Sequence, residues 1–207
     1  PENYLCYSNL RNVKRKPPAF GPGAFFVMHS RISSAIYTLV TMNSVELLPI
    51  DIGELQDLKR IGIEAFTESF ASVNNPEDFN TYLKEAFDVN TLRRELLNPE
   101  SRFFFLSAEG MRAGYAKINT GEAQTELQEA EGMEIERIYV LKAHQGKGLG
   151  AWMLKRFQTI ARAEGKSYLW LGVWEENHAA IRFYKQHGFV TFDKHPYYVG
   201  SDRQMDW

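Results

Sequence analysis

A glycine-rich turn near residue 146 is the segment whose residue types and spacing point most directly to chemistry. Residues 140 to 151 read VLKAHQGKGLGA, which is typical of a strand that passes through a short loop into a helix. Glycines let the backbone approach a ligand closely, and the first-turn N–H groups of a helix point toward it with the positive end of the helix dipole. A turn of this kind suits a phosphate group.

Two nucleotide-binding interpretations of this turn fit poorly. A P-loop is excluded because no Gly-Lys-Ser/Thr sequence follows the glycines. The degenerate dinucleotide fingerprint is met by Gly146-x-Gly148-x-x-Ala151, with acidic residues at 175 and 176. That fingerprint normally opens the first strand–helix–strand unit of a doubly wound sheet. Only 57 residues follow position 150, too few for the rest of such a sheet.

A third interpretation takes Gln145-x-x-Gly148-x-Gly150 as a cradle for the pyrophosphate of coenzyme A. The spacing of glycines around the start of a helix allows it. On this segment alone, a turn that binds no ligand stays open as well.

A second group of residues with a characteristic spacing lies about 30 residues downstream, between Asn177 and Phe189. Asn177 is suited to cap the start of a helix, and Gly188 is suited to the position just after its end. Ile181 and Tyr184 are three residues apart and share one side of that helix. Tyr184 can therefore be a core aromatic residue or part of a site.

The overall composition excludes several classes of protein. The chain has 207 residues, 44% of them hydrophobic, with 24 Lys and Arg against 26 Asp and Glu. Neither a disordered protein nor a basic nucleic-acid binder has this balance, and no run approaches the roughly 20 apolar residues of a bilayer span. The single cysteine and the scattered histidines offer no disulfide or metal-ligand spacing. We expect a cytoplasmic protein that binds no metal, nucleic acid or membrane.

The first 41 residues differ from the rest of the chain. They hold five Lys and Arg against one acidic residue, and four of the eight prolines, whereas residues 42 to 207 hold 19 basic and 25 acidic residues. They also show no sustained hydrophobic period. We expect 1–41 to be an N-terminal extension, disordered or foreign to the domain, with an extra ordered arm or an organelle-targeting segment as the alternatives. One domain is expected at 42–207.

Hydrophobic patterning along 42–207 predicts alternating helices and strands, as in the α/β class. The expected strands are 45–50, 102–108, 112–119, 134–140, 167–174 and 189–199. The second and third form a hairpin across a Glu-Gly turn at 109 and 110. The expected helices begin after Asp51, Asn75 and Asn90, and at positions 148 and 177.

Taken in order, the glycine turn, the strand at 169–173 (LWLGV) and the segment at 177–189 resemble the GCN5-related N-acetyltransferase family. Three further segments look like PaiA-type bacterial polyamine acetyltransferases: 134–140 (EIERIYV), 170–175 (WLGVWE) and 123–126 (AQTE). The resemblance covers residues 42 to 207. It implies an α/β fold with a central mixed, mostly antiparallel twisted sheet. Helices would flank this sheet, which would be splayed where strands 134–140 and 167–174 meet. The family's final strand would continue past Trp207, so this strand is expected to be short or incomplete.

The resemblance also implies an acetyl-CoA site. Backbone groups of Ile138, Tyr139 and Val140 would pair with the pantetheine arm, because a splayed strand leaves ladder groups for a ligand. Asn177 and Tyr184 would lie near the thioester. The residues implied for the pyrophosphate are Gln145, Gly146, Lys147, Gly148, Leu149, Gly150 and Ala151.

Direct attack of an amine on the thioester in a ternary complex needs a base and an acid. Tyr184 is the expected acid, because a phenol of ordinary pKa, about 10, stays protonated at neutral pH. Glu136 is the expected base, because strand alternation would put it on one face with Ile138 and Val140. The alternative for Glu136 is a solvent-facing glutamate paired with a neighbouring cation.

The acceptor is expected to be a polyamine such as spermidine or spermine. Six glutamates and no Lys or Arg lie between Lys117 and Arg137, at positions 122, 126, 129, 131, 134 and 136. Such a segment can attract a polycation. Gly172 stands where relatives that act on ribosomal-protein N-termini often have a glutamate, so a protein N-terminus is the second expectation. A non-catalytic acetyl-CoA sensor is the third, and the oligomeric state stays open, a homodimer included.

Overall fold

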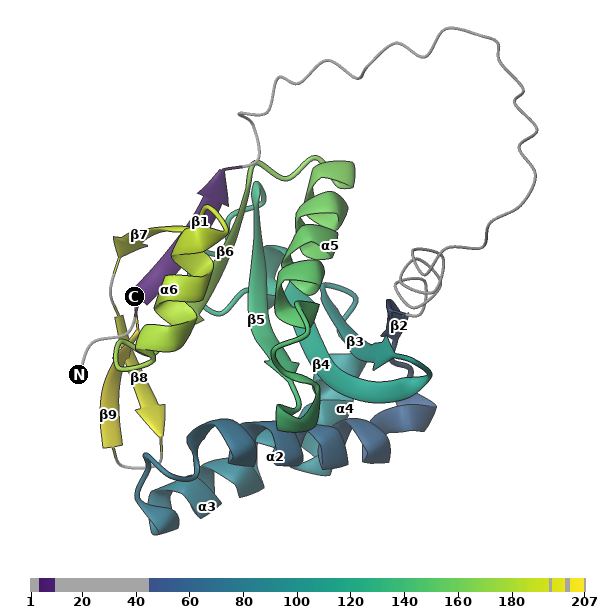
Figure 1. Cartoon of the computed structure of the whole chain (residues 1–207), viewed down its shortest axis with the longest axis vertical. Helices are drawn as coiled ribbons and strands as arrows, with labels where there is room; N and C mark the ends of the chain where they lie inside the picture. Colours follow the sequence, from purple (N-terminus) through teal and green to yellow (C-terminus); the bar gives the residue numbers. More distant parts are fainter. Residues whose placement is uncertain (1–3, 10–44, 194, 200–201, 207) are drawn as a thin grey trace, which may run out of the picture.

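The computed structural model describes residues 4–9, 45–193, 195–199 and 202–206. A seven-stranded sheet in the order β2-β3-β4-β5-β6-β1-β7 forms its centre, beside a separate β8–β9 hairpin (Figure 1). The strands are β1 Tyr4–Asn9, β2 Val45–Pro49, β3 Ser101–Ala108, β4 Met111–Asn119, β5 Gly132–Val140, β6 Tyr168–Val173, β7 Val190–Asp193, β8 His195–Val199 and β9 Asp202–Asp206. The helices are α2 Leu55–Phe70, α3 Pro76–Ala86, α4 Val89–Leu97, α5 Leu149–Ala163 and α6 His178–Gln186. The expected mixed, mostly antiparallel sheet is confirmed, with β5 and β6 as its parallel pair.

Helices cover both faces of this sheet, and two hydrophobic clusters fix them there. α5 packs on one face, where Met153, Leu154 and Phe157 are fully buried. α2 and α4 pack on the other face around Leu58 and Leu92, also fully buried, and cross below the strands in Figure 1. Each such side chain contributes about 1.5 to 3 kcal/mol by leaving water. The two layers therefore hold the sheet between them.

The sheet opens between β5 and β6. These strands pair only from Gly132 to Glu134 on β5, opposite Tyr168 to Trp170 on β6. Beyond Glu134, β5 continues to pair with β4 alone among the described strands. The splay expected at the junction of strands 134–140 and 167–174 is confirmed.

A β-bulge lies in β5 at the start of this opening. Lys117 of β4 faces Arg137, but the next residue, Ile118, faces Ile135, so Glu136 is the extra residue. An extra residue shifts the alternation of side chains between the two faces. On the N-terminal side of the bulge Ile135 faces α5, and on its C-terminal side Ile138 faces α5.

The bulge corrects the strand argument made for Glu136. Ile138 and Val140 pack toward α5. Glu136 pairs instead with Lys117, whose ammonium group lies 5.4 Å from the ring of Phe103 on the opposite face. The expectation that Glu136 shares a face with Ile138 and Val140 is wrong, because simple alternation does not survive an inserted residue.

Two element boundaries also differ from expectation. Asp88, and not Asn90, caps α4, because its carboxylate accepts the N–H groups of Asn90 and Thr91 at 2.9 and 3.2 Å. The strand expected at 189–199 is divided into β7 and β8, and position 194 lies outside the described residues.

The N-terminal stretch contributes one strand to the sheet. β1 lies between β6 and β7 and is antiparallel to both. The expectation that all of residues 1 to 41 lies outside the domain is therefore wrong for 4–9. Residues 1–3 and 10–41 of that stretch lie outside the described part of the chain.

Candidate active site

The splay between β5 and β6 forms a cavity of about 370 Å³. It is lined by seven of the residues expected from the sequence: Glu136, Ile138, Tyr139, Val140, Gln145, Asn177 and Tyr184. α2 and α3 contribute Phe66, Phe70 and Tyr82 to its other wall. A second cavity, of about 470 Å³ and next to Arg102 and Glu164, contains none of the expected site residues.

The glycine turn lies next to this cavity. Gln145 lines the cavity and donates from Nε2 to the carbonyl oxygen of Val140 at 2.9 Å, which ties the turn to the end of β5. On the other side of the turn, the backbone N–H of Lys142 donates to Glu68 of α2 at 2.7 Å. The turn is thus anchored to the sheet and to a helix.

The backbone of the turn suits a bound pyrophosphate. Gly146 and Gly148 adopt φ of 74° and 76°, a left-handed conformation that favours glycine. Gly148 is the N-cap of α5, and as a glycine it has no side chain to cap the first-turn N–H groups of Leu149, Gly150 and Ala151. A Cβ at Gly146 or Gly148 would meet no described atom within 4 Å. The turn therefore presents open N–H groups at a helix N-terminus, as an anion site requires.

α6 brings Tyr184 to the wall of the cavity opposite β5. Asn177 caps this helix, because its Oδ1 accepts the N–H of Ala180 at 3.1 Å. Tyr184 is 9% exposed, and its ring lies 5.3 Å from that of Phe183 and 5.7 Å from that of Phe189. Tyr184 is therefore a core residue that also reaches the cavity.

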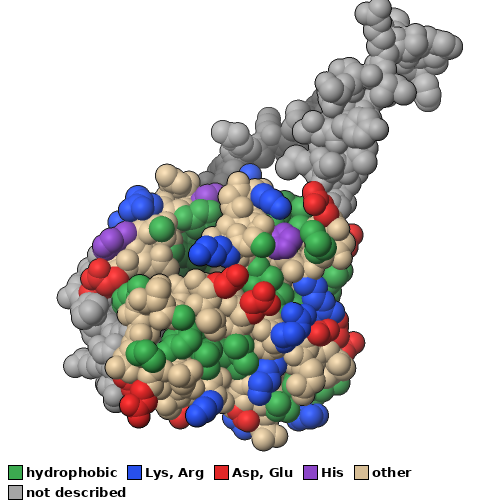
Figure 2. All heavy atoms as spheres, turned by 60° about the horizontal axis from the view of Figure 1, so that its bottom comes forward, with side chains coloured by type: hydrophobic (Ala, Val, Ile, Leu, Met, Phe, Trp, Pro, Cys, Tyr) green, Lys and Arg blue, Asp and Glu red, His purple; other side chains and the backbone are tan. Residues whose placement is uncertain are grey.

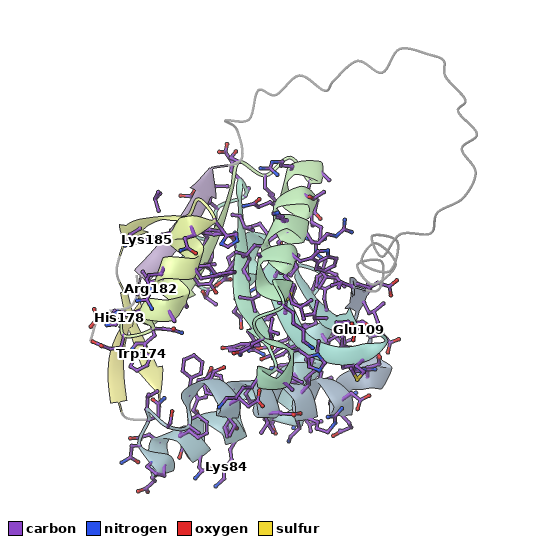
Figure 3. All side chains as sticks on the ribbon, viewed as in Figure 1. Lys84, Glu109, Trp174, His178, Arg182 and Lys185 are labelled. Atoms are coloured by element: carbon purple, nitrogen blue, oxygen red, sulfur yellow. The ribbon has the colours of Figure 1, made fainter. Side chains whose placement is uncertain are left out.

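Trp174 adds a polar atom to this wall. It follows β6 and lies beside α6, whose outer side carries His178, Arg182 and Lys185 (Figure 3). The buried indole Nε1 of Trp174 has no hydrogen-bond partner among the described residues. Trp174 lines the cavity, so this donor lies in the cavity wall.

Glu136 is held in a buried ionic network. Its carboxylate lies 2.5 Å from Lys117 Nζ and 3.0 Å from Arg137 Nη2. Glu95 of α4 pairs with the same two cations at 3.4 and 3.0 Å. Burial alone would raise the pKa of Glu136, but Arg137 and Lys117 lower it, and the net shift is downward. A carboxylate of lowered pKa is a weak proton acceptor.

Glu134, two residues away, has a different environment. It is 2% exposed, and burial together with the charge of Glu136 raises its pKa to about 7. Three hydrogen bonds to its carboxylate oppose this shift: from Thr125 Oγ1 at 2.5 Å, Thr125 N at 3.0 Å and Asn119 Nδ2 at 2.9 Å. Glu134 lines the same cavity as Tyr184.

Aromatic rings form much of the wall between α2, α3 and the sheet. Phe66 stacks on Tyr82 with ring centroids 4.8 Å apart, and Tyr115 stacks on Tyr139 at 5.4 Å. The hydroxyl of Tyr115 is buried without a hydrogen-bond partner among the described side chains. These rings can pack against a hydrocarbon chain, and their faces can attract a cation.

The acidic segment converges on the cavity only in part. Glu126, Glu134 and Glu136 line it. Glu129 instead accepts a hydrogen bond from Tyr168, and Glu131 one from Ser167. On the face where α2 and α3 come forward (Figure 2), the described acidic and basic side chains are interspersed.

Glu134 is the site residue that the sequence interpretation named only as part of the acidic segment. The sequence does contain a signal that Glu134 and Glu136 differ. Apolar residues of β5 occupy odd positions at first (Met133, Ile135) and even positions later (Ile138, Val140). Such a change indicates a bulge at 136 and 137. No comparable signal exists for Asn119 or for Lys117, which contact the carboxylates from β4.

The described residues contain no group of three or more His, Cys, Asp or Glu side chains arranged to hold a metal ion. None of the helices in the described ranges has the length and hydrophobicity needed to cross a bilayer.

Comparisons with known proteins identify relatives of this chain. A family model described as the acetyltransferase (GNAT) family matches residues 64–189. An uncharacterized N-acetyltransferase in the pepI 3′ region of Lactobacillus delbrueckii subsp. lactis is 37% identical over 166 residues, which cover 80% of this chain and 96% of that protein. A spermidine N(1)-acetyltransferase of Thermoplasma acidophilum is 23% identical over 167 residues, covering 79% and 96%. The crystal structure of the PaiA N-acetyltransferase of Thermoplasma acidophilum with coenzyme A aligns with a TM-score of 0.63 and 22% identity, over 79% of this chain and 98% of that one.

Proposed function

The chain belongs to the acetyltransferase (GNAT) family and is an acetyl-CoA-dependent N-acetyltransferase, and we propose that its acceptor is a polyamine, attacked directly in a ternary complex. The observation that carries the proposal is the cavity between β5 and β6. Glu134 and Tyr184 line it, and the glycine turn begins at its edge with Gln145. A base, an acid and a cradle for the pyrophosphate of coenzyme A thus belong to one site.

Acetyl-CoA supplies the thioester, and this chain supplies its binding groups. The splayed edge of β5 at Ile138, Tyr139 and Val140 offers backbone groups to the pantetheine arm. The N–H groups at the start of α5 face the pyrophosphate. Asn177 caps α6, the helix that carries Tyr184, and both residues line the cavity.

We assign the base to Glu134 in place of Glu136. An alkyl ammonium has a pKa of about 10.4, so a base must remove its proton at neutral pH. The raised pKa of Glu134, about 7, makes it a better acceptor than an ordinary carboxylate. The lowered pKa of Glu136 makes that residue a poorer one. Glu136 is thus the neighbour of the base.

Tyr184 donates a proton to the departing sulfur in this proposal. A thiol has a pKa of about 8.5 and a phenol about 10, so this transfer is at most mildly uphill. The position of Tyr184 on the cavity wall opposite β5 supports the assignment.

Three observations support a polyamine acceptor. The relative from Thermoplasma acidophilum named as a spermidine N(1)-acetyltransferase is 23% identical. Glu126 lines the cavity beside Glu134, so a carboxylate is present for a distal ammonium group. The rings of Phe66, Phe70 and Tyr82 can pack against the methylene groups between the amines.

A thiol-release assay with a panel of amines tests the proposal. Spermidine should release coenzyme A much faster than propylamine, because the distal ammonium groups orient the reacting one. Faster release with a peptide bearing a free N-terminus would replace the polyamine by a protein N-terminus. Binding of acetyl-CoA without release to any amine would identify a sensor and overturn the enzymatic assignment of the site.

A further inference from the structure

We propose that Thr125 and Asn119 are positioning residues that hold the Glu134 carboxylate at the cavity, and that the charge of Glu136 sets the pH at which Glu134 accepts a proton. The proposal rests on the proposed function, because it concerns the base of that reaction. It gives a role to the Ala123–Glu126 segment, which the catalytic assignment leaves without one.

Thr125 is brought to Glu134 by an anchored loop. The preceding residue, Gln124, is 1% exposed and accepts a hydrogen bond from Trp170 Nε1 at 2.7 Å. Gln124 Nε2 donates to the backbone oxygens of Gly121 and Glu129 at 3.2 and 2.9 Å. Thr125 then donates to both oxygens of Glu134, one from its hydroxyl and one from its backbone N–H. The loop is therefore fixed on β6 where the splay begins.

Asn119 holds Glu134 from the opposite strand. Its Nδ2 donates to Glu134 at 2.9 Å and to Glu136 at 2.6 Å, so a single amide bridges the two carboxylates. Its Oδ1 accepts the hydroxyl of Ser101 at 2.9 Å, which fixes the orientation of the amide. Asn119 is fully buried, and this arrangement uses both ends of its side chain.

The charges near Glu134 are that of Glu136 and those of the residues paired with Glu136. The negative charge of Glu136, whose carboxylate shares the amide of Asn119 with Glu134, disfavours ionisation of Glu134. Lys117 and Arg137 pair with Glu136 and lower its pKa, and Glu95 of α4 pairs with the same two cations. The other described titratable residues that line the cavity are Tyr82, Tyr115, Glu126, Arg137, Tyr139 and Tyr184.

This arrangement predicts shifts of opposite sign. Removing the Thr125 hydroxyl takes away a hydrogen bond to the ionised form of Glu134, so its pKa should rise. Removing the charge of Glu136 takes away a repulsion and leaves Lys117 and Arg137 less compensated, so the pKa of Glu134 should fall. A residue that only supported the fold would move neither value in a defined direction.

The experiment compares Thr125→Val and Glu136→Gln in the full chain. The midpoint of the rise of kcat/KM with pH should move up by about one unit in Thr125→Val and down by about one unit in Glu136→Gln. Thr125→Val keeps the backbone N–H bond and the side-chain volume. Thr159→Val, at an exposed hydroxyl of α5, and Glu64→Gln, at an exposed carboxylate of α2, are the matched controls and should leave the profile unchanged.

A carboxyl NMR titration of Glu134 provides a readout that does not depend on turnover. The same opposite shifts should appear there even if the chain acetylates none of the amines tested, which separates this inference from the proposed function. Shifts of the same sign in both variants, or no shift in either folded variant, would overturn the proposal. Thermal unfolding of each variant identifies one that has failed to fold. In that case Asn119→Ser, which removes the bridge to Glu134, is measured in its place and should raise the pKa of Glu134.

Discussion

The two parts of β5 on either side of the bulge at Glu136 offer different kinds of groups to a ligand. On the C-terminal side, the strand edge at Ile138–Val140 and the turn that follows it at Gly146–Gly148 present backbone groups. On the N-terminal side, Glu134 is defined by side chains from β4 and from the Gln124–Thr125 loop. Backbone sites depend on conformation, whereas side-chain sites depend on chemical identity. Binding of acetyl-CoA at the C-terminal part should therefore respond to changes of backbone geometry. Catalysis at the N-terminal part should respond to the removal of single side-chain groups.

Tyr184→Phe should have one of the two largest effects, because it removes the hydroxyl that donates the proton in the proposed mechanism. We expect kcat to fall by about 10²- to 10⁴-fold, the usual range for a lost acid–base group, with little change in acetyl-CoA affinity. Stopped-flow thiol release and calorimetry measure the two quantities. Tyr168→Phe, which removes a hydroxyl bonded to Glu129 away from the cavity, is the control. A rate near that of the unchanged protein would make Tyr184 a packing residue only.

Gly148→Val tests the backbone groups of the C-terminal part. A β-branched residue at φ 76° is strained and projects into the space next to the α5 N-terminus. We expect acetyl-CoA affinity to weaken by more than tenfold, about 1.4 kcal/mol. Gly165→Val introduces comparable strain at φ 70°, beyond the other end of α5. It should lower stability without changing affinity, and equal losses of affinity in both variants would remove the turn from the site.

Glu126→Gln should have a smaller effect, confined to the acceptor. We expect the KM for spermidine to rise about three- to tenfold, since a partly exposed ion pair contributes about 1 kcal/mol. The effect should shrink as salt rises toward 0.5 M, because exposed charges are screened over about 8 to 10 Å already at 0.1 to 0.15 M. Glu122→Gln, outside the cavity, is the control. An unchanged KM would mean that Glu126 does not contact the acceptor.

The smallest expected effect is on stability. The folded-state pKa of Glu134, about 7, is higher than the ordinary value of 4.5, so the folded protein binds more protons than the unfolded chain between these values. Its contribution is fully present below about pH 4.5 and is lost as pH rises through about 7. We expect Tm to fall by a few degrees from pH 5 to pH 8, at about 2 to 4 °C per kcal/mol for a domain of this size. A Tm that fell equally in Glu134→Gln would remove Glu134 as the cause.

The sequence predicted the fold, the glycine turn and the cap of α6 better than the side-chain contacts around Glu134. Glycine spacing and helix caps are local signals, so the turn at Gly146–Gly148 and the cap at Asn177 could be identified from neighbours in the chain. The choice between Glu134 and Glu136 depends on a bulge and on Lys117, Asn119 and Glu95, which approach from other elements. Hydrophobic periodicity could have indicated the bulge, but the ion pairs that lower the pKa of Glu136 are tertiary contacts with no sequence pattern.

The N-terminal strand illustrates the same limit. Composition separated residues 1–41 from the domain, because charge and proline content describe the stretch as a whole. A six-residue strand such as β1 pairs with β6 and β7 through backbone hydrogen bonds. Pairing of this kind needs no distinctive composition, so the sequence offered no signal for it.

The pH dependence of kcat/KM for the best amine of the panel, compared between Glu134→Gln and Glu136→Gln, decides which glutamate is the base. We expect Glu134→Gln to lower kcat/KM by about 10²- to 10⁴-fold and to abolish the ionisation near pH 7. Glu136→Gln should lower kcat/KM by about tenfold or less and retain an ionisation, shifted to lower pH. A severe loss in Glu136→Gln together with a normal ionisation near pH 7 in Glu134→Gln would contradict the assignment of Glu134 and identify Glu136 as the base.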